Sequence, residues 1–481
     1  MIKLFDKPSK ELSVNSDDQK ANEINLIQGK RPYMRAFHFS WLSFHIAFTG
    51  WFAIAPLLPY IMEDLKLTSE QTEDGNIVNV AAAVFFRFLV GPLCDRFGPR
   101  RVMALLLILG SIPVGLSALV HSPTGLIVVR FFIGILGATF VPCQFWTTQM
   151  FSKNIVGSAN ALVGGWGNMG AGITTIVLAL IAAGFNSAGL SPSLSWRVSL
   201  AIPAFLCFTI GLCDYFFTDD CPQGDWSKRG LPPTEIHMAR DEKKIVVNDG
   251  NKVVSDTASI TDSEKNIPAP TTQKRDLKTF LLALKDPNVP LLMIMYACSF
   301  GVELAVDGAL TLFFYKQKNF NLSKKNAGLI ASLFGLMNLF SRATGGFISD
   351  FANEKIGIRG RLLTQLIIYL LEGLFLFVFP YALNSLSEAI IILILFSYFT
   401  QAGCGSTFAI VPYINPELMG VVSGLVGGGG SIGGAVFAAV FKKYPDSSMP
   451  FTILGIIVMI VSFATFLLKV EERRLIEFKR K

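Results

Sequence analysis

The sequence predicts an all-α membrane protein with 12 transmembrane helices in two pseudo-symmetric six-helix bundles. The first observation is composition: 51% of the 481 residues are hydrophobic and only 16% are charged, whereas about a quarter of the residues in soluble domains are charged. The second is segregation, because the apolar residues gather in blocks of roughly 20 residues, enough for a helix to cross a bilayer. The third is an internal repeat that relates the first six blocks to the last six.

The apolar blocks also set the order of the segments along the chain. A polar N-terminal tail, 1–36, has no pattern of a cleaved signal peptide. The first bundle covers 37–217, a central loop 218–286, the second bundle 287–469 and a C-terminal tail 470–481. The loop is rich in Asp, Lys, Ser, Thr and Pro without helical periodicity, so we expect an irregular linker. The predicted spans are 37–61, 76–94, 102–121, 125–148, 156–185, 194–217, 289–315, 326–350, 362–383, 387–411, 416–441 and 450–468.

The distribution of Lys and Arg predicts that both termini are cytoplasmic. Without the central loop, segments on the side of the termini carry 20 of these residues, and segments on the other side carry 8. Cytoplasmic loops of membrane proteins carry such an excess. We therefore expect a multi-pass protein of the plasma membrane. Its net charge of +7 comes from basic residues that orient it in the lipid bilayer, so we expect no nucleic-acid partner.

Three motifs recur in the two halves at offsets of 255, 268 and 263 residues. Like-oriented halves of this kind place a substrate site between them near the middle of the membrane. This architecture is typical of a transporter. The repeats pair Arg87-x3-Gly91-x3-Asp95 with Arg342-x3-Gly346-x3-Asp350, Gly137–Phe140 with Gly405–Phe408, and Leu162–Gly170 with Leu425–Gly433.

Arg87 and Arg342 are the strongest candidate binding residues. A charged side chain within the membrane costs about 2.5–3.5 kcal/mol even on the lenient insertion scale. Snorkelling to the interface or a structural ion pair are the alternatives, but Asp95 and Asp350 lie eight residues further on, roughly 12 Å along a helix. A planar guanidinium offers paired donors to a planar oxyanion. We therefore predict an anion site between the two arginines.

Phe140 and Phe408 form a second repeated pair. Either they are ordinary core or lipid-facing residues, or their rings enclose a flat, weakly hydrated anion. The glycine stretches beside Asn168 and Ser431 contain the letters GxGxxG, but no strand precedes them, which excludes a dinucleotide site. Small residues in membrane helices let backbones approach closely, with or without ligand contact.

The carboxylates Glu303, Asp307 and Glu372 lie within predicted spans. Intramembrane carboxylates suggest proton coupling, but these residues could equally pair with Arg130 or with lysines near the outer face. The four His are scattered along the sequence and the Cys form no closely spaced pair, so no metal site and no catalytic nucleophile can be recognised. We therefore expect neither enzymatic activity nor a cofactor.

Several stretches resemble one known family. Gly91–Arg101 resembles the loop 2–3 motif of the major facilitator superfamily, and Arg130-x3-Gly134-x2-Gly137 resembles its span 4 motif. Phe140–Gly172 and Gln401–Gly433 are similar to the two signatures of the nitrate/nitrite porter family. The resemblance covers about residues 35–470.

Finer features resemble the eukaryotic high-affinity nitrate transporters. They are Tyr296–Leu304 and Asp219–Gly224, while the long central loop and short C-terminal tail resemble fungal members. Two residues depart from the family pattern: Ser431 and Gly308 stand where relatives carry Asn.

The resemblance implies a site as well as a fold, the major facilitator fold. It implies that Arg87 and Arg342 clamp nitrate between Phe140 and Phe408. The remaining positions implied for the site are Asn168, Tyr296, Gly164 and Ser431.

Charge arithmetic favours proton-coupled import. Moving a lone anion against an inside-negative potential costs about 2.3 kcal/mol per 100 mV, and one accompanying proton makes the step electroneutral. We therefore expect proton symport by alternating access, with nitrate and protons as partners. A porter for nitrite or another small oxyanion, and a receptor that signals without turnover, are the alternatives.

The remaining candidates concern regulation. Ser259 and Thr261 precede acidic residues and are candidate phosphorylation sites, unless the loop is simply solvated disorder. Asn321 begins an outer-side glycosylation sequon, unless it lies too close to the membrane to be used. Kinases and, through the lysines of the tails and loop, the ubiquitin machinery are the expected partners.

Overall fold

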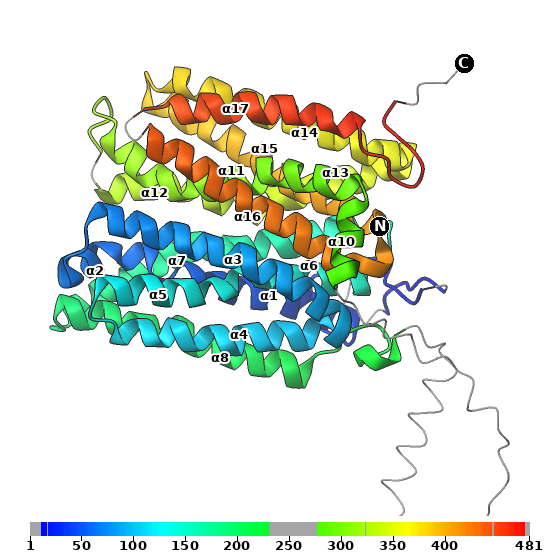
Figure 1. Ribbon diagram of the computed structural model, residues 1–481, viewed down its shortest axis with the longest axis horizontal. Helices are drawn as coiled ribbons and strands as arrows, with labels where there is room; N and C mark the ends of the chain where they lie inside the picture. The colour runs from blue at the N-terminus through cyan, green and yellow to red at the C-terminus, as the bar shows by residue number, and fades with distance from the viewer. Residues whose placement is uncertain (1–10, 17, 230–276, 323, 445–446, 477–481) are drawn as a thin grey trace, which may run out of the picture.

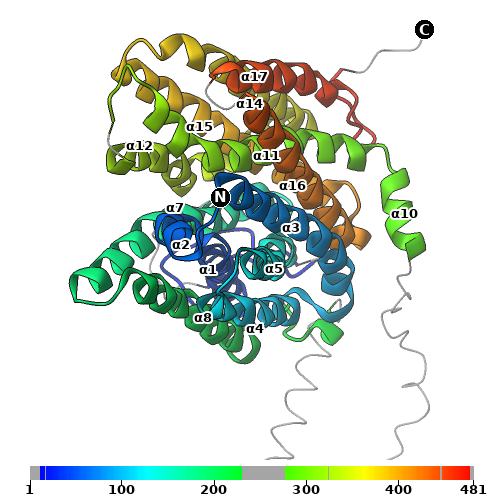
Figure 2. The same cartoon turned by 60° about the vertical axis from the view of Figure 1, so that its left-hand side comes forward.

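Two helical bundles lie side by side in the computed structural model (Figures 1 and 2). The structure describes residues 11–16, 18–229, 277–322, 324–444 and 447–476. The first and the last described residues of the chain lie at the same end of the molecule, where the described residues on either side of the central loop also lie (Figure 1). We call this end, which carries Arg35, Arg100 and Lys285, the tail end.

The N-terminal bundle follows the predicted spans in order. Its helices are α1 (Tyr33–Phe52) continued by η1 (Ala55–Leu57) and α2 (Leu58–Leu65), α3 (Ser69–Phe97), α4 (Pro99–Leu116) with η2 (Ser117–Leu119), α5 (Pro123–Ile133) continued by η3 (Gly134–Thr139) and α6 (Phe140–Met150), α7 (Val156–Ser187) and α8 (Pro192–Phe217).

The C-terminal bundle repeats this order. Its helices are α11 (Asn288–Lys316), α12 (Lys324–Leu336) continued by η6 (Met337–Leu339) and α13 (Ser341–Ile356), α14 (Ile358–Val378) with η7 (Phe379–Ala382), α15 (Leu386–Ile410) with η8 (Val411–Tyr413), η9 (Pro416–Leu418) leading into α16 (Met419–Lys443), and α17 (Met449–Ser462) with η10 (Phe463–Phe466).

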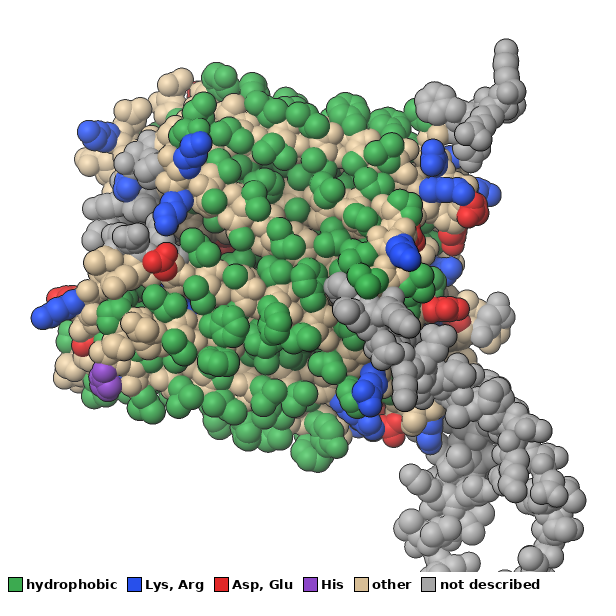
Figure 3. Space-filling model, in the orientation of Figure 1, with side chains coloured by type: hydrophobic (Ala, Val, Ile, Leu, Met, Phe, Trp, Pro, Cys, Tyr) green, Lys and Arg blue, Asp and Glu red, His purple; other side chains and the backbone are tan. Residues whose placement is uncertain are grey.

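The apolar surface fits a membrane. Ten helices of the described residues are long and apolar enough to cross one. Hydrophobic side chains cover the middle of the face seen in Figure 3, and charged side chains gather at its two ends. The predicted all-α membrane fold is confirmed. The two remaining predicted spans, 37–61 and 326–350, are interrupted helices, broken around Pro56, which has no N–H to donate, and at Phe340.

Glycines let the bundles touch at the tail end. On α3, a Cβ added to Gly91 would lie 2.6 Å from the carbonyl oxygen of Gly420 on α16. Just below this crossing, the Asp95 carboxylate accepts hydrogen bonds from the backbone N–H groups of Gly420 (3.3 Å) and Val421 (3.2 Å). A carboxylate at a helix N-terminus satisfies free N–H groups and the helix dipole. Asp95 therefore joins the two bundles.

Asp350 makes the corresponding contact from the other half. Its Oδ2 accepts hydrogen bonds from the N–H and the hydroxyl of Ser158, near the start of α7, both at 2.5 Å. Its Oδ1 pairs with Nη2 of Arg361 at 2.7 Å. The repeated Asp thus caps a helix of the opposite bundle in each half, and neither pairs with the binding-site arginines.

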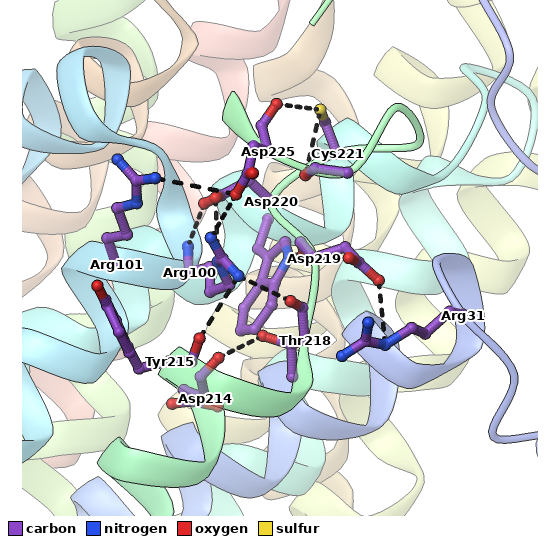
Figure 4. A network of polar contacts seen from close by, with 12 residues as sticks. Arg31, Arg100, Arg101, Asp214, Tyr215, Thr218, Asp219, Asp220, Cys221 and Asp225 are labelled. Atoms are coloured by element: carbon purple, nitrogen blue, oxygen red, sulfur yellow. Dashed lines mark hydrogen bonds and ion pairs between the residues drawn. The ribbon is translucent and has the colours of Figure 1, made fainter. Parts of the chain in front are cut away.

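A polar network holds the beginning of the central loop against the N-terminal bundle (Figure 4). Arg100 pairs with Asp220 at 3.1 Å and with Asp225 at 2.7 Å. Burial raises the pKa of Asp220 to about 6, although the Arg100 charge acts in the opposite direction. Trp226 donates from Nε1 to the Asp95 carbonyl at 3.1 Å, so this segment lies directly beneath the α3–α16 contact.

The structure differs from the prediction at both ends of the central loop, and it shows a packed segment in the N-terminal tail. Residues 218–229 are packed as just described, and α10 (Leu277–Lys285) is a helix inside the segment predicted to be irregular. In the tail, Ala21 and Ile24 are fully buried, and Ala21 pairs through its backbone with Phe151. The few apolar residues of the tail thus have apolar partners on the bundle.

We predict that Gly91→Ala destabilises the closed tail end. The added methyl group meets backbone of α16 that cannot rotate away, and overpacking of this kind costs about 1–3 kcal/mol. The melting temperature of the purified protein in detergent should fall. Gly184→Ala is the matched control, because a Cβ on Gly184 of α7 has no atom within 4 Å. Equal melting temperatures for the two variants would contradict the close contact.

Candidate functional site

Two arginines from equivalent positions meet between the bundles. Arg87 lies on α3, and Arg342 is the second residue of α13, two residues after the break at Phe340. Their exposed fractions are 0% and 1%. The guanidinium carbons of both lie 5.4 Å from the centre of the same ring, Phe140. The repeated arginines therefore share one enclosed space.

Backbone carbonyls hold Arg87. Its Nε donates to the Gly137 carbonyl at 2.9 Å, and its Nη1 donates to the Gly427 carbonyl of α16 at 2.7 Å. The third nitrogen, Nη2, is buried without a hydrogen-bond partner among the described residues. Because a buried donor without an acceptor is costly, Nη2 marks a place for an acceptor atom.

Side chains hold Arg342. Its Nη2 donates to the Tyr296 hydroxyl at 2.8 Å. Its Nη1 lies 3.8 Å from Oε2 of Glu303, close enough for an ion pair. No described residue accepts a hydrogen bond from Nη1. Each arginine thus presents one unsatisfied, buried N–H group.

Aromatic rings surround the pair. The ring centres of Phe140 and Phe408 are 4.7 Å apart and edge to face, and Tyr296 lies 4.9 Å from Phe408. Phe300 stacks on Tyr296 at 5.3 Å and lies 4.9 Å from the Arg87 guanidinium carbon. Rings at these distances attract a cation and exclude water. The arginines are charged groups in a dry, aromatic enclosure.

Small residues leave room beside the arginines. A Cβ on Gly164 of α7 would lie 2.8 Å from Nε of Arg342, so only glycine fits there. Gly427 faces Phe140 and Arg87. Ser431 lies one turn further along α16, hence on the same helical face, and its hydroxyl is buried without a partner among the described residues. Asn in place of Gly308, by contrast, would enter open space.

Glu303 forms the polar centre of the C-terminal side of the site. Its Oε1 accepts hydrogen bonds from the side-chain amides of Asn338 (2.7 Å) and Asn168 (3.3 Å). Its Oε2 accepts from the Cys404 thiol at 3.5 Å. Asn168 belongs to the N-terminal bundle, so this carboxylate bridges the bundles and at the same time faces Arg342.

Asp307 and Glu372 occupy different places. Asp307, one turn after Glu303 on α11, helps to line a cavity of about 10 Å³ with Glu303, Asn168 and Asn338, room for about one water molecule. Glu372 lies outside this cavity, buried on α14 facing Gly403. None of the three pairs with Arg130, whose Nη2 donates to Asn76 at 2.6 Å.

The modification candidates lie away from the site. Asn321 is exposed between α11 and α12, and its backbone has a positive φ of 44°. Ser259 and Thr261 lie outside the described residues.

Sequence reasoning missed three contributors to the site: Phe300, Asn338 and Cys404. Phe300 follows Tyr296 by one helical turn, and Cys404 precedes Phe408 by one turn. That spacing was the available signal. Asn338 had no such signal, because it lies in η6, where the predicted helix is interrupted.

Comparison with known proteins agrees with this architecture. Residues 40–438 match the model of the Major Facilitator Superfamily. Two solved structures share the fold. The human organic anion transporter MFSD10 has 16% identity, a TM-score of 0.58 and coverage of 90% of this chain and 100% of that chain. The proton:xylose symporter XylE has 13% identity, a TM-score of 0.64 and coverage of 91% and 95%.

Sequence relatives are closer. High affinity nitrate transporter 2.5 of Arabidopsis thaliana is 35% identical over 89% of this chain and 77% of its own length. Nitrate transporter 2.1 of Chlamydomonas reinhardtii is 35% identical over 92% of this chain and 74% of its own length. The nitrate/nitrite transporter NrtP of Nostoc punctiforme is 30% identical over 90% of this chain and 92% of its own length. These relatives come from a plant, an alga and a cyanobacterium, so the likeness to fungal members stays a prediction. The chain belongs to the Major Facilitator Superfamily and, within it, to the family of the high-affinity nitrate transporters, which are transporters and not enzymes.

Proposed function

We propose that this protein imports nitrate across the plasma membrane by proton symport, with its tail end in the cytoplasm. Nitrate binds between Arg87 and Arg342, and the two bundles rock about this site to expose it alternately on either side. The relatives named above carry nitrate transport in their names. The excess of Lys and Arg at the tail end supports the orientation.

The arginine pair is the observation that carries this proposal. Two buried guanidinium groups each hold one N–H without an acceptor among the described residues. Nitrate is planar, carries one negative charge and has three oxygen atoms, so it can accept from both arginines at once. The rings of Phe140 and Phe408 suit its weakly hydrated faces. Ser431 and Asn168 are the further donors that we assign to it.

Glu303 is our candidate for the coupling residue. While ionised, it faces Arg342 and competes with the substrate for that charge. When a proton neutralises Glu303, Arg342 keeps an uncompensated buried charge, which is costly. Nitrate then supplies the missing negative charge. Proton and nitrate therefore favour each other's binding, and the pair moves without net charge. Asp307 lies where it can relay a proton toward Glu303 from the end opposite the tails.

The conformation shown is closed at the tail end and tightly packed at the site. Asp95 and Asp350 hold the bundles together there, and the cavity beside Glu303 is too small for nitrate. Binding thus requires the bundles to separate on the opposite side, where Phe48 and Phe52 line the same cavity. This requirement agrees with alternating access.

Nitrite is a second candidate substrate, because one of the relatives is named a nitrate/nitrite transporter and because Ser431 offers fewer donor groups than Asn. Competition of unlabelled nitrite with labelled nitrate uptake measures this preference. A receptor without turnover would show no uptake in a host that lacks its own nitrate transporters.

Replacement of either arginine by Lys should weaken nitrate uptake. A charge-assisted hydrogen bond contributes about 1.5–3 kcal/mol, which corresponds to a Km higher by roughly ten-fold to a hundred-fold for Arg87→Lys or Arg342→Lys. Labelled nitrate uptake at matched surface expression measures this change. Arg197→Lys is the control, since Arg197 pairs with Asp64 outside the site. An unchanged Km in both site variants would exclude the clamp.

Glu303→Gln should remove the pH dependence of uptake. In the wild type, uptake should rise as the pH outside falls, because the proton is a co-substrate. The amide mimics the protonated acid, so the variant should bind nitrate at neutral pH yet fail to drive accumulation by a proton gradient. Nitrate-induced acidification of proteoliposomes measures the coupling. Glu388→Gln, an exposed site on α15, is the control, and retained acidification in Glu303→Gln would assign the coupling elsewhere.

A further inference from the structure

We propose that a chain of buried side chains in the C-terminal bundle, centred on Tyr369, carries the proton from Glu303 toward the tail end. This inference rests on the proposed symport and adds a route for the proton that is separate from the route of the anion. The chain is Cys404, Ser299, Tyr369 and Thr407, and we call it the relay. All four residues are buried, with exposed fractions near zero.

Helical spacing builds the relay from three helices. Ser299 lies one turn before Glu303 on α11, and Cys404 lies one turn before Thr407 on α15. Tyr369 on α14 reaches between these helices. Residues three or four apart share one helical face, so each helix presents its polar groups in line along the bundle.

The contacts lead from the site outward with one step that a rotation must close. The Cys404 thiol donates to Oε2 of Glu303 at 3.5 Å. Ser299 lies against the adjoining residue of α15, since a Cβ added to Gly403 would lie 3.3 Å from the Ser299 side chain, and rotation of the Ser299 hydroxyl toward the thiol closes the step between them. The Tyr369 hydroxyl donates to Oγ of Ser299 at 2.8 Å. It also lies 2.8 Å from Oγ1 of Thr407. Four groups thus connect the carboxylate facing Arg342 to a hydroxyl near the C-terminal end of α15.

Competing acceptors make the relay able to reorient. The single proton of the Tyr369 hydroxyl has three acceptors within 2.9 Å: Ser299 Oγ, Thr407 Oγ1 and the Met295 carbonyl. Thr407 likewise has the Gly403 carbonyl at 2.9 Å as an alternative. A hydroxyl can rotate between acceptors and both donate and accept, which is what proton hopping requires. A network built only for stability would need one fixed orientation.

The transfer balances along the relay. The protonated Glu303 gives its proton to the Cys404 sulfur as that thiol gives its own proton to Ser299. Ser299 passes its proton to Tyr369, Tyr369 to Thr407, and Thr407 to water that enters when the tail end opens. Each O–H or S–H bond that breaks is replaced by one that forms, and Glu303 ends ionised beside Arg342. No oxidation or reduction occurs.

Gln365 closes the relay in the present conformation. Its amide Nε2 donates to Thr407 at 2.8 Å, and an amide N–H cannot accept a proton in return. Its Oε1 accepts from Ser406 at 2.5 Å. One turn before Gln365 on α14 lies Arg361, the partner of Asp350 in the tail-end contact. Separation of the bundles there would disturb this end of α14 and admit water to Thr407.

The N-terminal bundle has no counterpart. At the repeat offset of 268 residues, Leu136 stands in place of Cys404, and Thr139 in place of Thr407. The Thr139 hydroxyl donates to the Leu136 carbonyl. On α4, the helix that corresponds to α14, Val102–Gly110 contains only apolar residues and glycine. The polar line is thus a property of the half that contains Glu303.

Other ionisable groups lie near the relay. Glu372 lies one turn after Tyr369 on α14, and Cys298 directly precedes Ser299 on α11; both are buried. Arg342 faces it from α13 through Glu303. The Glu372 carboxylate has no hydrogen-bond partner among the described residues, whereas the Cys404 thiol donates to Glu303, so the relay begins at Cys404.

Tyr369→Phe tests the relay, because it removes one oxygen and leaves the ring. Full-length protein is reconstituted in liposomes that contain a pH-sensitive dye. Nitrate-driven acidification should fall at least ten-fold, while exchange of labelled for unlabelled nitrate, which needs no net proton movement, should stay within about two-fold. Tyr398→Phe is the matched control, since the Tyr398 hydroxyl contacts Thr344 and lies outside the relay.

Thr407 supplies a second pair of variants if Tyr369→Phe does not fold. Thr407→Val keeps the shape and removes the hydroxyl, so acidification should be lost, whereas Thr407→Ser should keep it. Wild-type acidification per nitrate in Thr407→Val and Tyr369→Phe would overturn the relay and leave symport intact. Equal loss of exchange and acidification in both would also overturn it, because a merely structural role has that effect. Absence of acidification in the wild type would instead overturn the symport itself.

Discussion

The cost of keeping two positive charges in a membrane constrains the rest of this structure. Arg87 and Arg342 are fully enclosed, and an isolated charge at such depth is unfavourable. The protein compensates with close backbone carbonyls on one side and with a hydroxyl and a carboxylate on the other. Close carbonyls need glycine-rich helices, and the carboxylate needs its own amide donors. The glycine stretches, the break before Arg342 and the Glu303 cluster are all linked to this one requirement.

The internal repeat also determines the contacts between the two bundles. In each half the arginine is followed after two turns by an Asp that caps a helix of the opposite bundle. The arginine and the cap therefore lie on one continuous helix in each half, interrupted in α3 only by Pro92, which removes one backbone hydrogen bond. A change in the spacing of the bundles at the tail end thus acts on the same helices that carry the arginines.

Much of this arrangement could be predicted from the sequence. The lengths of the spans follow from the apolar blocks. The repeat identifies Arg87, Arg342, Phe140 and Phe408, because a residue that occurs at the same position in both halves is supported by two separate stretches of sequence. What could not be predicted are neighbours across helices. The contacts of Tyr369 depend on how α14 is rotated against α11 and α15, and an apolar block of this kind carries no clear periodicity. The packing of Ala21 in the tail depends on a single backbone pairing, which composition does not reveal.

The Gly427 carbonyl that holds Arg87 belongs to the other bundle, and this has a consequence for the unloaded protein. In the closed state it accepts a hydrogen bond from Arg87 across the interface, and the Glu303 carboxylate, in the same bundle as Arg342, faces the other arginine. Both act as built-in substitutes for the cargo. If the arginines bind the anion as proposed, the protein can pass through its closed state while empty. A carrier able to return without cargo performs net accumulation, whereas one whose charges need an external anion at every step can only exchange one ion for another.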